Sequence, residues 1–224
     1  MTDREMTRRM FLGGLAAATP AAMMAAHAQE AKQPKDKAKD KPKDGKKKDW
    51  KELFNGKDLT GWKPEGKAAW KVEDGVLIGT QGPGNAPGDL FTVDEFADFR
   101  LVVEYKLQWP ANSGVWFRYQ NPETSYQADM LEYKDPEAYT GTIYCPGRMF
   151  LSRNLDPKLE KKDDWNTMKI TAKGGHLEVE LNGVKVGDVE DTAIAKGRIG
   201  FQIHPGDEFK DMKLSVRKMR LLVL

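Results

Sequence analysis

The sequence of 224 residues predicts an all-β fold, a sandwich of two antiparallel sheets. After Trp50, short runs of alternating apolar and polar residues are separated by Gly, Asn, Asp and Pro, a pattern typical of short antiparallel strands. The same region has no apolar spacing that predicts a long helix. About a dozen strands result, which is more than one open sheet of ordinary size holds. Two stacked sheets are therefore expected.

The clearest strand covers 99–107, where every second residue from Phe99 to Leu107 is apolar. Residues 176–181 alternate in the same way, and Asn182-Gly183 then predicts a type I′ hairpin turn into a strand at Val184. The other strands are predicted, in chain order, at 70–73, 76–79, 89–93, 113–119, 126–131, 140–144, 165–172, 197–204 and 209–219. The polar segment 155–164 is predicted to be an exposed loop.

Composition excludes several classes of protein and of site. Hydrophobic residues make up 39% of the chain and charged residues 31%, and residues 50–224 are long enough for one domain with a core. A single cysteine, Cys145, excludes an intrachain disulfide framework and cysteine-based zinc sites. Three histidines, of which His27 lies near the N-terminus, exclude a multi-histidine metal site. The sequence has no P-loop, no dinucleotide-binding fingerprint, no GxSxG elbow and no HExxH motif.

Residues 1–28 are predicted to be a signal peptide. Arg8 and Arg9 precede a moderately apolar stretch, 11–26, and the small-x-small triplet 26–28 supplies a cleavage site. The arginine pair followed by Met, Phe and Leu resembles the twin-arginine export signal. The alternative, a membrane anchor, is disfavoured because this stretch contains glycines and a proline and is shorter than the roughly 20 apolar residues of a span. We expect a periplasmic or extracellular location.

Charge separates a linker from the predicted domain, 50–224. Residues 29–49 are predicted to be a disordered linker, since they carry nine Lys against four Asp and no aromatic or branched aliphatic residue. Residues 50–224 hold 24 basic and 27 acidic residues, so the domain is acidic although the whole chain has a net charge of +2. An acidic domain without basic and aromatic clusters argues against nucleic acid. The linker is interpreted as a solvated spacer or as a contact to anionic envelope components.

Polar residues recur on the outward parity of the predicted strands. If these strands are neighbours, the polar residues line one cleft, namely Glu104, Arg118, Gln127, Asp129, Gln202 and His204. Amides and carboxylates bind sugar hydroxyls, and Trp116 and Tyr144 would supply platforms for the apolar faces of sugar rings. Each member also has a simpler interpretation. Glu104 could be a solvated outer residue, Arg118 could pair with Asp129 across strands, and His204 could end a strand.

Nine segments, in order along residues 50–220, resemble the 3-keto-disaccharide hydrolase domain family, formerly a domain of unknown function. They are LFNGKDLTGW (53–62), WKVEDGVLIG (70–79), DFRLVVEYKL (98–107), NSGVWFR (112–118), YQADM (126–130), GTIY (141–144), DWNTMKI (164–170), LNG (181–183) and GRIGFQIH (197–204). The resemblance implies a concanavalin-like jelly-roll sandwich that acts on glycosides oxidised at the sugar C3, as a hydrolase or a lyase. It also implies a sugar 3-dehydrogenase upstream. Asn112, which opens one of these segments, joins the candidate substrate-binding residues Gln127, Gln202, Trp116 and Tyr144.

One departure from the family pattern concerns the carboxylates. Many members carry a Glu-x-Gln pair where this chain has Gln127-Ala128-Asp129, which leaves the acting carboxylate open. A C3 ketone acidifies the C2 proton, so the glycosidic bond can be broken by elimination with a base, an electrophile for the enolate and an acid. The hypothesis takes His204 or Asp129 as the base and Glu104 as the acid. Arg118, or a divalent metal held by Asp129, Glu104 and His204, would stabilise the enolate.

Three alternatives stay open at this stage. Two carboxylates could hydrolyse the bond directly. The domain could be a non-catalytic carbohydrate-binding module, because a fold does not fix a function. It could also be a structural surface protein displayed on the lysine-rich linker.

Overall fold

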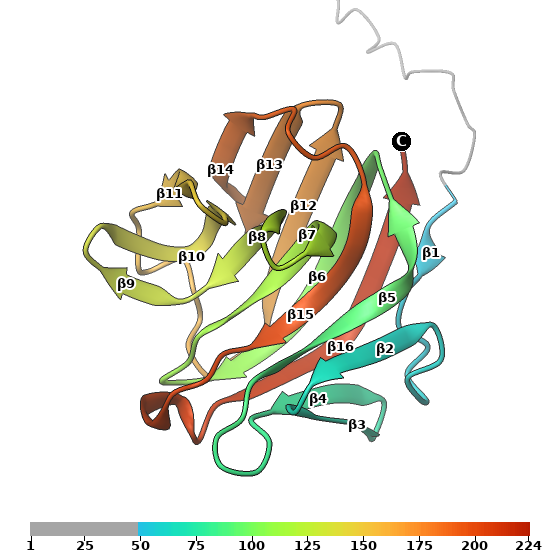
Figure 1. The fold of residues 1–224 in the computed structure, drawn as a ribbon, viewed down its shortest axis with the longest axis vertical. Coiled ribbons are helices and arrows are strands. Elements are labelled where there is room, and N and C mark those ends of the chain that lie inside the picture. Colours follow the sequence, from blue (N-terminus) through green and yellow to red (C-terminus); the bar gives the residue numbers. More distant parts are fainter. Residues whose placement is uncertain (1–48) are drawn as a thin grey trace, which may run out of the picture. The chain divides into compact units, whose positions relative to one another are not determined.

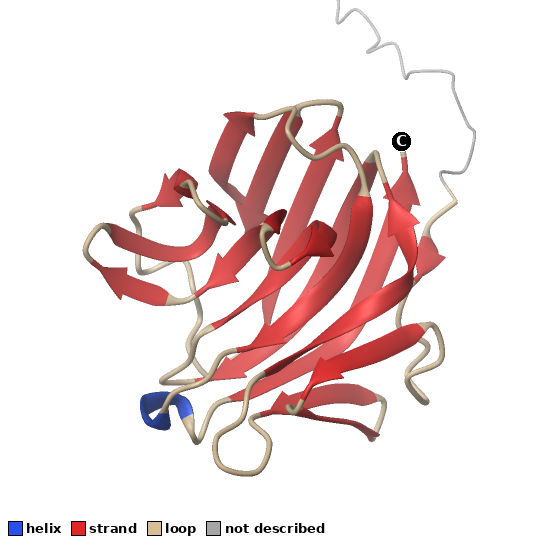
Figure 2. Cartoon of the chain, viewed as in Figure 1, coloured by secondary structure: helices blue, strands red, loops and turns tan. Residues whose placement is uncertain are grey.

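The computed structural model describes residues 49–224, so the predicted signal peptide and all but the last residue of the predicted linker lie outside the described residues. Two antiparallel eight-stranded sheets lie face to face (Figure 1). Apart from a 3-10 turn, η1 (Asp207–Phe209), the regular structure of this region consists of strands, as Figure 2 shows. Within residues 49–224, no helix is long and apolar enough to cross a membrane. The predicted all-β sandwich of two antiparallel sheets is confirmed.

The first sheet has the strand order β14-β13-β12-β6-β16-β4-β3, and β1 pairs with β16 beside this path. Its strands are β1 (Lys51–Glu52), β3 (Ala69–Glu73), β4 (Val76–Thr80), β6 (Phe99–Gln108), β12 (Asn166–Lys173), β13 (His176–Leu181), β14 (Val184–Glu190) and β16 (Lys213–Val223). The long central pair β6 and β16 runs from the register Lys213 with Gln108 to Val223 with Phe99.

The second sheet has the strand order β11-β10-β8-β7-β15-β5-β2, and β9 pairs with β10 beside this path. Its strands are β2 (Trp62–Gly66), β5 (Gly88–Phe96), β7 (Ser113–Asn121), β8 (Thr124–Met130), β9 (Glu132–Lys134), β10 (Glu137–Cys145), β11 (Met149–Asn154) and β15 (Gly197–Ile203). Four of them, β8, β7, β15 and β5, are consecutive neighbours, and they form the floor on which the candidate site lies.

The hydrophobic core lies between the two sheets. Every second residue of β6 from Phe99 to Leu107 is fully buried, as the alternation predicts. Val115 and Phe117 of β7 and Phe201 of β15 enter the core from the second sheet. Burial of one side chain of this size contributes about 1.5–3 kcal/mol to folding. One face of each central strand is thereby committed to the core, which leaves the opposite face for function.

The predicted hairpin turn after β13 is present. Asn182 and Gly183 both have positive φ, 51° and 86°, as a type I′ turn requires. The predicted strand 209–219 begins later, at Lys213, because η1 and the residues after it occupy the first part of that range. Strands β1, β2, β9 and β11 were not predicted. They are short or lie at the sheet edges, where the alternation signal is weak.

The polar segment 155–164 contains no strand, yet it is not wholly exposed. Glu160 is half-buried, and its Oε2 accepts a hydrogen bond from the Tyr105 hydroxyl of β6 at 2.7 Å. Burial raises the pKa of Glu160 to about 7. The prediction of a fully exposed loop is therefore wrong at Glu160. The polarity of the segment predicted exposure to solvent, but Glu160 is the hydrogen-bond partner of an inward-facing tyrosine.

Candidate functional site

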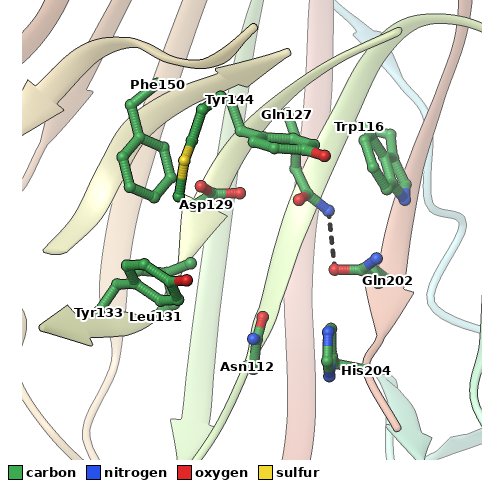
Figure 3. Close-up of a pocket in the computed structure, with 11 residues that line it drawn as sticks. Asn112, Trp116, Gln127, Asp129, Leu131, Tyr133, Tyr144, Phe150, Gln202 and His204 are labelled. Carbon is green, nitrogen blue, oxygen red and sulfur yellow. Dashed lines mark hydrogen bonds between the residues drawn. The ribbon is translucent and has the colours of Figure 1, made fainter. Parts of the chain in front are cut away.

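A pocket of about 260 Å³ opens on the outer face of the second sheet (Figure 3). The structure places seven of the predicted site residues around it: Asn112, Trp116, Gln127, Asp129, Tyr144, Gln202 and His204. Four further lining residues were not foreseen from the sequence: Leu131, Tyr133, Met149 and Phe150. The volume is just below the roughly 300–1,000 Å³ of pockets for drug-sized ligands, so the pocket suits a small ligand.

Strand register explains why residues far apart in the sequence meet here. One row across the sheet runs from Asp89 to Gln202, then to Gly114 and Asp129, each paired with the next on the neighbouring strand. Because paired residues point to the same face of a sheet, this row places an amide and a carboxyl on either side of a glycine.

The next row along the strands carries larger side chains. It runs from Phe91 through Gly200 to Trp116, Gln127 and Tyr144. These residues lie at the same level of β5, β15, β7, β8 and β10, and three of them reach the pocket. The pocket floor is thus built from two adjacent rows of one sheet.

Gly114 makes the centre of the floor hollow. A Cβ at this position would lie 2.6 Å from Cγ and Cδ of Gln127, a contact that real Cβ atoms do not make. The Gln127 side chain occupies that space, and its Nε2 donates to Oε1 of Gln202 at 3.1 Å. The two amides are therefore fixed relative to each other across the glycine, with the Gln202 amide N–H groups left to bind a ligand.

Asp129 is the buried carboxyl of the site. It is 2% exposed, and its Oδ2 is buried without a hydrogen-bond partner among the described residues. Burial alone raises the pKa of Asp129 well above its usual range, because an apolar surrounding disfavours the charged form. Burial therefore favours the protonated carboxylic acid over the carboxylate at Asp129. A carboxylic acid of this kind can donate a hydrogen bond or a proton to a ligand oxygen.

His204 follows the last residue of β15. Its Nδ1 lies 2.6 Å from the carbonyl oxygen of Pro205, and its ring packs edge-on against Phe209 with the centroids 5.8 Å apart. A carbonyl oxygen only accepts hydrogen bonds, so Nδ1 carries the proton in this contact. The neutral ring then has its lone pair on Nε2, which can accept a proton.

A second carboxyl, the half-buried Asp89, supports the site, and it was not predicted from the sequence. Trp116 donates its indole N–H to Oδ1 of Asp89 on β5 at 2.8 Å. Burial raises the pKa of Asp89 to about 6, although the bond from Trp116 acts in the opposite direction. Asp89 opens a predicted strand, but its place on the same face as the pocket residues follows only from the strand register, which the sequence does not provide.

Glu104 does not belong to this pocket. It lies on β6 in the other sheet, where its Oε2 accepts a bond of 2.9 Å from Arg217 Nε. Its placement in the cleft is wrong because the alternation fixes only which face of a strand a residue occupies, not which sheet the strand joins. The proposed metal ligand set of Asp129, Glu104 and His204 is consequently not assembled.

Arg118 is also placed elsewhere, although it lies on β7. It has a positive φ of 49° in a stretch where the register with β8 shifts, and such a bulge breaks the alternation. The guanidinium is fully buried and donates to the carbonyls of Ala97, Gly174 and Ile194 and to Oδ1 of Asp98, at 2.9–3.1 Å. Neither its role at the cleft nor its alternative pairing with Asp129 is found.

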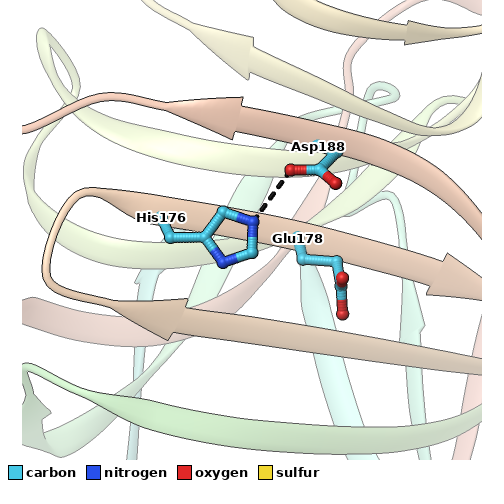
Figure 4. Close-up of side chains that lie close together, drawn as sticks. All are labelled: His176, Glu178 and Asp188. Atoms are coloured by element: carbon cyan, nitrogen blue, oxygen red, sulfur yellow. Dashed lines mark hydrogen bonds and ion pairs between the residues drawn. The ribbon is translucent and has the colours of Figure 1, made fainter.

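A separate cluster of possible metal ligands lies on β13 and β14 of the first sheet (Figure 4). One ligand atom each from His176, Glu178 and Asp188 lies within 4.8 Å of the others. His176 Nε2 is 2.8 Å from Oδ1 of Asp188, and Lys185 Nζ lies 2.5 Å from Oδ2 of Asp188 and 3.6 Å from Glu178. Because the Lys185 ammonium group already pairs with both carboxylates, the cluster is an exposed ion-pair network.

Comparisons with known proteins identify relatives of this chain. A 3-keto-disaccharide hydrolase of Bacteroides thetaiotaomicron is 32% identical over 93 residues, which cover 38% of this chain. The match spans 32% of that protein's length. A protein of Parabacteroides distasonis ATCC 8503, named as a candidate glycosyl hydrolase, has a similar structure, with a TM-score of 0.61, 24% identity and coverage of 79% of this chain and 100% of that one.

The fold also occurs outside this group. A Bacillus subtilis protein of unknown function with a galectin-like fold matches with a TM-score of 0.59 and 16% identity, over 73% of this chain and 90% of that one. At such low identities the structural matches establish the lectin-like sandwich. In sequence, residues 49–221 match the family described as 3-keto-alpha-glucoside-1,2-lyase-like domains. This match covers nearly the whole described region, and the chain therefore belongs to that family.

Proposed function

We propose that this chain cleaves the glycosidic bond of a 3-keto-glycoside in the pocket around Asp129. The observation that carries the proposal is the presence, in one pocket, of a buried carboxyl, whose pKa burial raises, and a histidine with an available Nε2. Among the described residues that line the pocket, Asp129 is the one carboxylate. Two-carboxylate hydrolysis needs a pair, so the lining favours elimination.

The steps follow from the chemistry of a C3 ketone. His204 Nε2 removes the proton from C2, and the electron pair forms the enolate. The enolate then expels the substituent at C1, which breaks the glycosidic bond. Asp129 gives its proton to the leaving oxygen. The products are a 2-hydroxy-3-keto-glycal and the free aglycone, and addition of water to the glycal completes a net hydrolysis.

The amides of the floor have a supporting role in this proposal. Gln127, Gln202 and Asn112 offer N–H donors and carbonyl acceptors to the sugar hydroxyls and the C3 oxygen. N–H groups aimed at the C3 oxygen stabilise the negative charge that develops there in the enolate. Trp116 and Tyr144 provide the apolar surfaces on which a sugar ring packs. Arg118 and Glu104 have no part, since they lie outside the pocket.

The test uses 3-keto-glucosides and two pocket variants. We expect Asp129→Asn and His204→Gln to lose about 10²- to 10⁴-fold in turnover, the usual contribution of a general acid or base. Glu104→Gln, a carboxyl-to-amide change on the other sheet, is the matched control and should keep full activity. Nuclear magnetic resonance should detect the glycal during turnover. Unchanged turnover in both pocket variants would reject the site, and hydrolysis without the glycal under trapping conditions would reject the elimination.

A non-catalytic carbohydrate-binding module is the second candidate. It is favoured by the galectin-like arrangement of the sheets and by a lining of amides and aromatic rings, which suffices for binding sugars without chemistry. The two candidates differ in a single observation. A binding module holds 3-keto-glucosides without ever releasing the aglycone, whereas the proposed enzyme releases it.

Export by the twin-arginine route is a proposal that rests on the sequence alone. Arg8 and Arg9 with the following apolar stretch support it. The double substitution Arg8→Lys/Arg9→Lys should leave the precursor inside the cell, as followed by cell fractionation and immunoblotting. Equal export of the variant and the natural sequence would contradict this route. A sugar 3-dehydrogenase would have to supply the 3-keto substrate, because the proposed elimination requires a ketone at C3.

A further inference from the structure

We propose that Tyr133, Met149 and Phe150 form a distinct subsite for the leaving group, one that selects 3-keto-glycosides whose aglycone has a flat apolar face. We call these three side chains the apolar rim. The inference rests on the proposed function and adds to it the class of aglycone that the pocket accepts.

The pocket has two chemically different sides. In the view of Figure 3, Asp129 lies between Phe150 and Tyr133 on one side and Gln202 and His204 on the other. The side with Gln202 and His204 offers hydrogen-bonding groups, whereas the rim offers two aromatic rings and a thioether. Because the proton of Asp129 goes to the leaving oxygen, the aglycone departs at the border between the two sides. The rim is then the surface next to the aglycone.

The rim is unusually exposed for its chemistry. Tyr133 and Met149 are 42% and 41% exposed, and both line the same pocket. Exposed apolar groups that gather at one pocket indicate a binding surface, whereas scattered ones need no explanation. The Tyr133 and Phe150 rings meet edge to face, with centroids 5.7 Å apart and planes at 82°. The three side chains of the rim are uncharged, which suits a neutral ligand.

The rim is also held in place before any ligand binds. Met149 follows the β10–β11 turn with a positive φ of 57°, and the preceding Arg148 forms an ion pair with Asp191. The Arg148 backbone N–H donates to the carbonyl of Cys145 at 3.1 Å, which closes the turn. A surface fixed in this way gains affinity because little conformational entropy is lost on binding.

The side that carries Tyr133 is fixed in a similar manner. Tyr133 lies on β9 opposite Ala138 of β10, and its neighbour Glu132 forms an ion pair of 2.6 Å with Lys162. Both edges of the rim are thus tied to other parts of the domain. Thioethers and aromatic rings both pack well on aromatic groups, so the chemistry of Tyr133 and Met149 suits an aromatic ring or the apolar face of a flat aglycone.

The experiment compares benzyl and methyl 3-keto-glucoside. Both leave as simple alcohols, so the same bond is broken, and the substrates differ in the ring that the rim would bind. We expect the benzyl compound to have the higher kcat/KM, and Met149→Ala or Tyr133→Ala to lower the ratio of benzyl to methyl kcat/KM about tenfold. Tyr133→Phe keeps the ring and should keep the ratio. Leu155→Ala, which shortens a side chain that is 56% exposed and outside the pocket, is the matched control.

Calorimetric binding of both compounds to Asp129→Asn protein separates the subsite from the reaction. The subsite is supported if the benzyl compound binds more tightly than the methyl compound and Met149→Ala abolishes this difference. This holds even if the natural protein turns over neither compound. Absence of turnover would by itself reject only the proposed function. Turnover of both compounds with no preference in kcat/KM or affinity overturns the subsite and leaves the proposed function standing. Failure of the protein to bind or cleave either compound overturns both.

Discussion

The indole N–H of Trp116 on β7 donates a hydrogen bond of 2.8 Å to Oδ1 of Asp89 on β5, across the intervening strand β15. The bond fixes the ring that closes one side of the pocket, and it does so with a carboxyl whose pKa is raised to about 6. Within residues 49–224 the Asp89 side chain makes no other hydrogen bond, so its role is to position Trp116 rather than to react.

Loss of this bond should destabilise the protein and loosen the site. Asp89→Ala leaves the Trp116 N–H without a partner, and we expect the free energy of unfolding to fall by about 1–3 kcal/mol. The KM for a 3-keto-glucoside should rise as well, because the ring is no longer fixed. Asp89→Asn keeps an acceptor oxygen and should preserve KM. Urea unfolding and steady-state kinetics measure both effects, and equal KM values for the two variants would contradict the positioning role.

The raised pKa of Asp89 predicts a specific pH dependence of stability. Between pH 4 and 6 the folded protein holds a proton on Asp89 that the unfolded chain, with a pKa near 3.8, has already lost. The free energy of unfolding therefore falls as the pH rises from 4 to 6. Above pH 6 the contribution of Asp89 no longer changes with pH. Asp89→Asn removes the effect, so its stability relative to the natural protein should increase from pH 4 to pH 6. A difference that is independent of pH would contradict the prediction.

Gly114→Ala should disturb the pocket floor without unfolding the domain. The new Cβ would lie 2.6 Å from the Gln127 side chain, which must move and thereby lose its bond to Gln202. We expect weaker binding of 3-keto-glucosides and a stability loss of about 1–3 kcal/mol from overpacking. In the double variant Gly114→Ala/Gln127→Ala, the stability should recover while binding stays weak, because the clash is gone and the amide is still missing. Additive losses of stability would show that the two residues do not interact.

Arg118 and Glu104 should separate stability from activity. Arg118→Ala leaves several buried carbonyls without a donor and should cost about 3–5 kcal/mol, as for other buried cations. Glu104→Gln breaks an exposed pair and should change stability by less than about 1 kcal/mol. Thermal unfolding measures both. Folded Arg118→Ala molecules should have the same kcat as the natural protein. A loss of kcat per folded molecule would show that Arg118 takes part in the reaction after all.

Glu160 is expected to make the domain less stable as the pH approaches neutrality. Its pKa is raised from 4.5 to about 7, so the folded state retains a proton through this window and the unfolded chain does not. Glu160→Gln should therefore gain stability relative to the natural protein between pH 4.5 and 7. It should also keep an acceptor for the Tyr105 hydroxyl, a bond that Tyr105→Phe would remove. Unfolding curves at several pH values give the comparison, and parallel pH profiles would refute it.

The sequence by itself determined the fold class and the faces of the strands. Alternation placed Gln127 and Asp129 on one face of their strand, and Gln202 and His204 on one face of theirs. All four residues line the pocket. This worked because the side-chain period of a regular strand is two, so a local pattern is sufficient. The ordered motifs also predicted the family, which the match over 49–221 confirms.

Only the tertiary structure decided which strands are neighbours and where regularity breaks. Glu104 has the same outward parity as Asp129 but lies in the opposite sheet, and the row of Asp89, Gln202, Gly114 and Asp129 exists only through strand pairing. Parity carries no information on pairing, because hydrogen bonds between strands join residues that are distant in the chain. The positive φ of Arg118 breaks the alternation that placed it with Trp116. The apolar rim likewise depends on β9 and β11 both pairing with β10, which brings Tyr133, Met149 and Phe150 to one pocket.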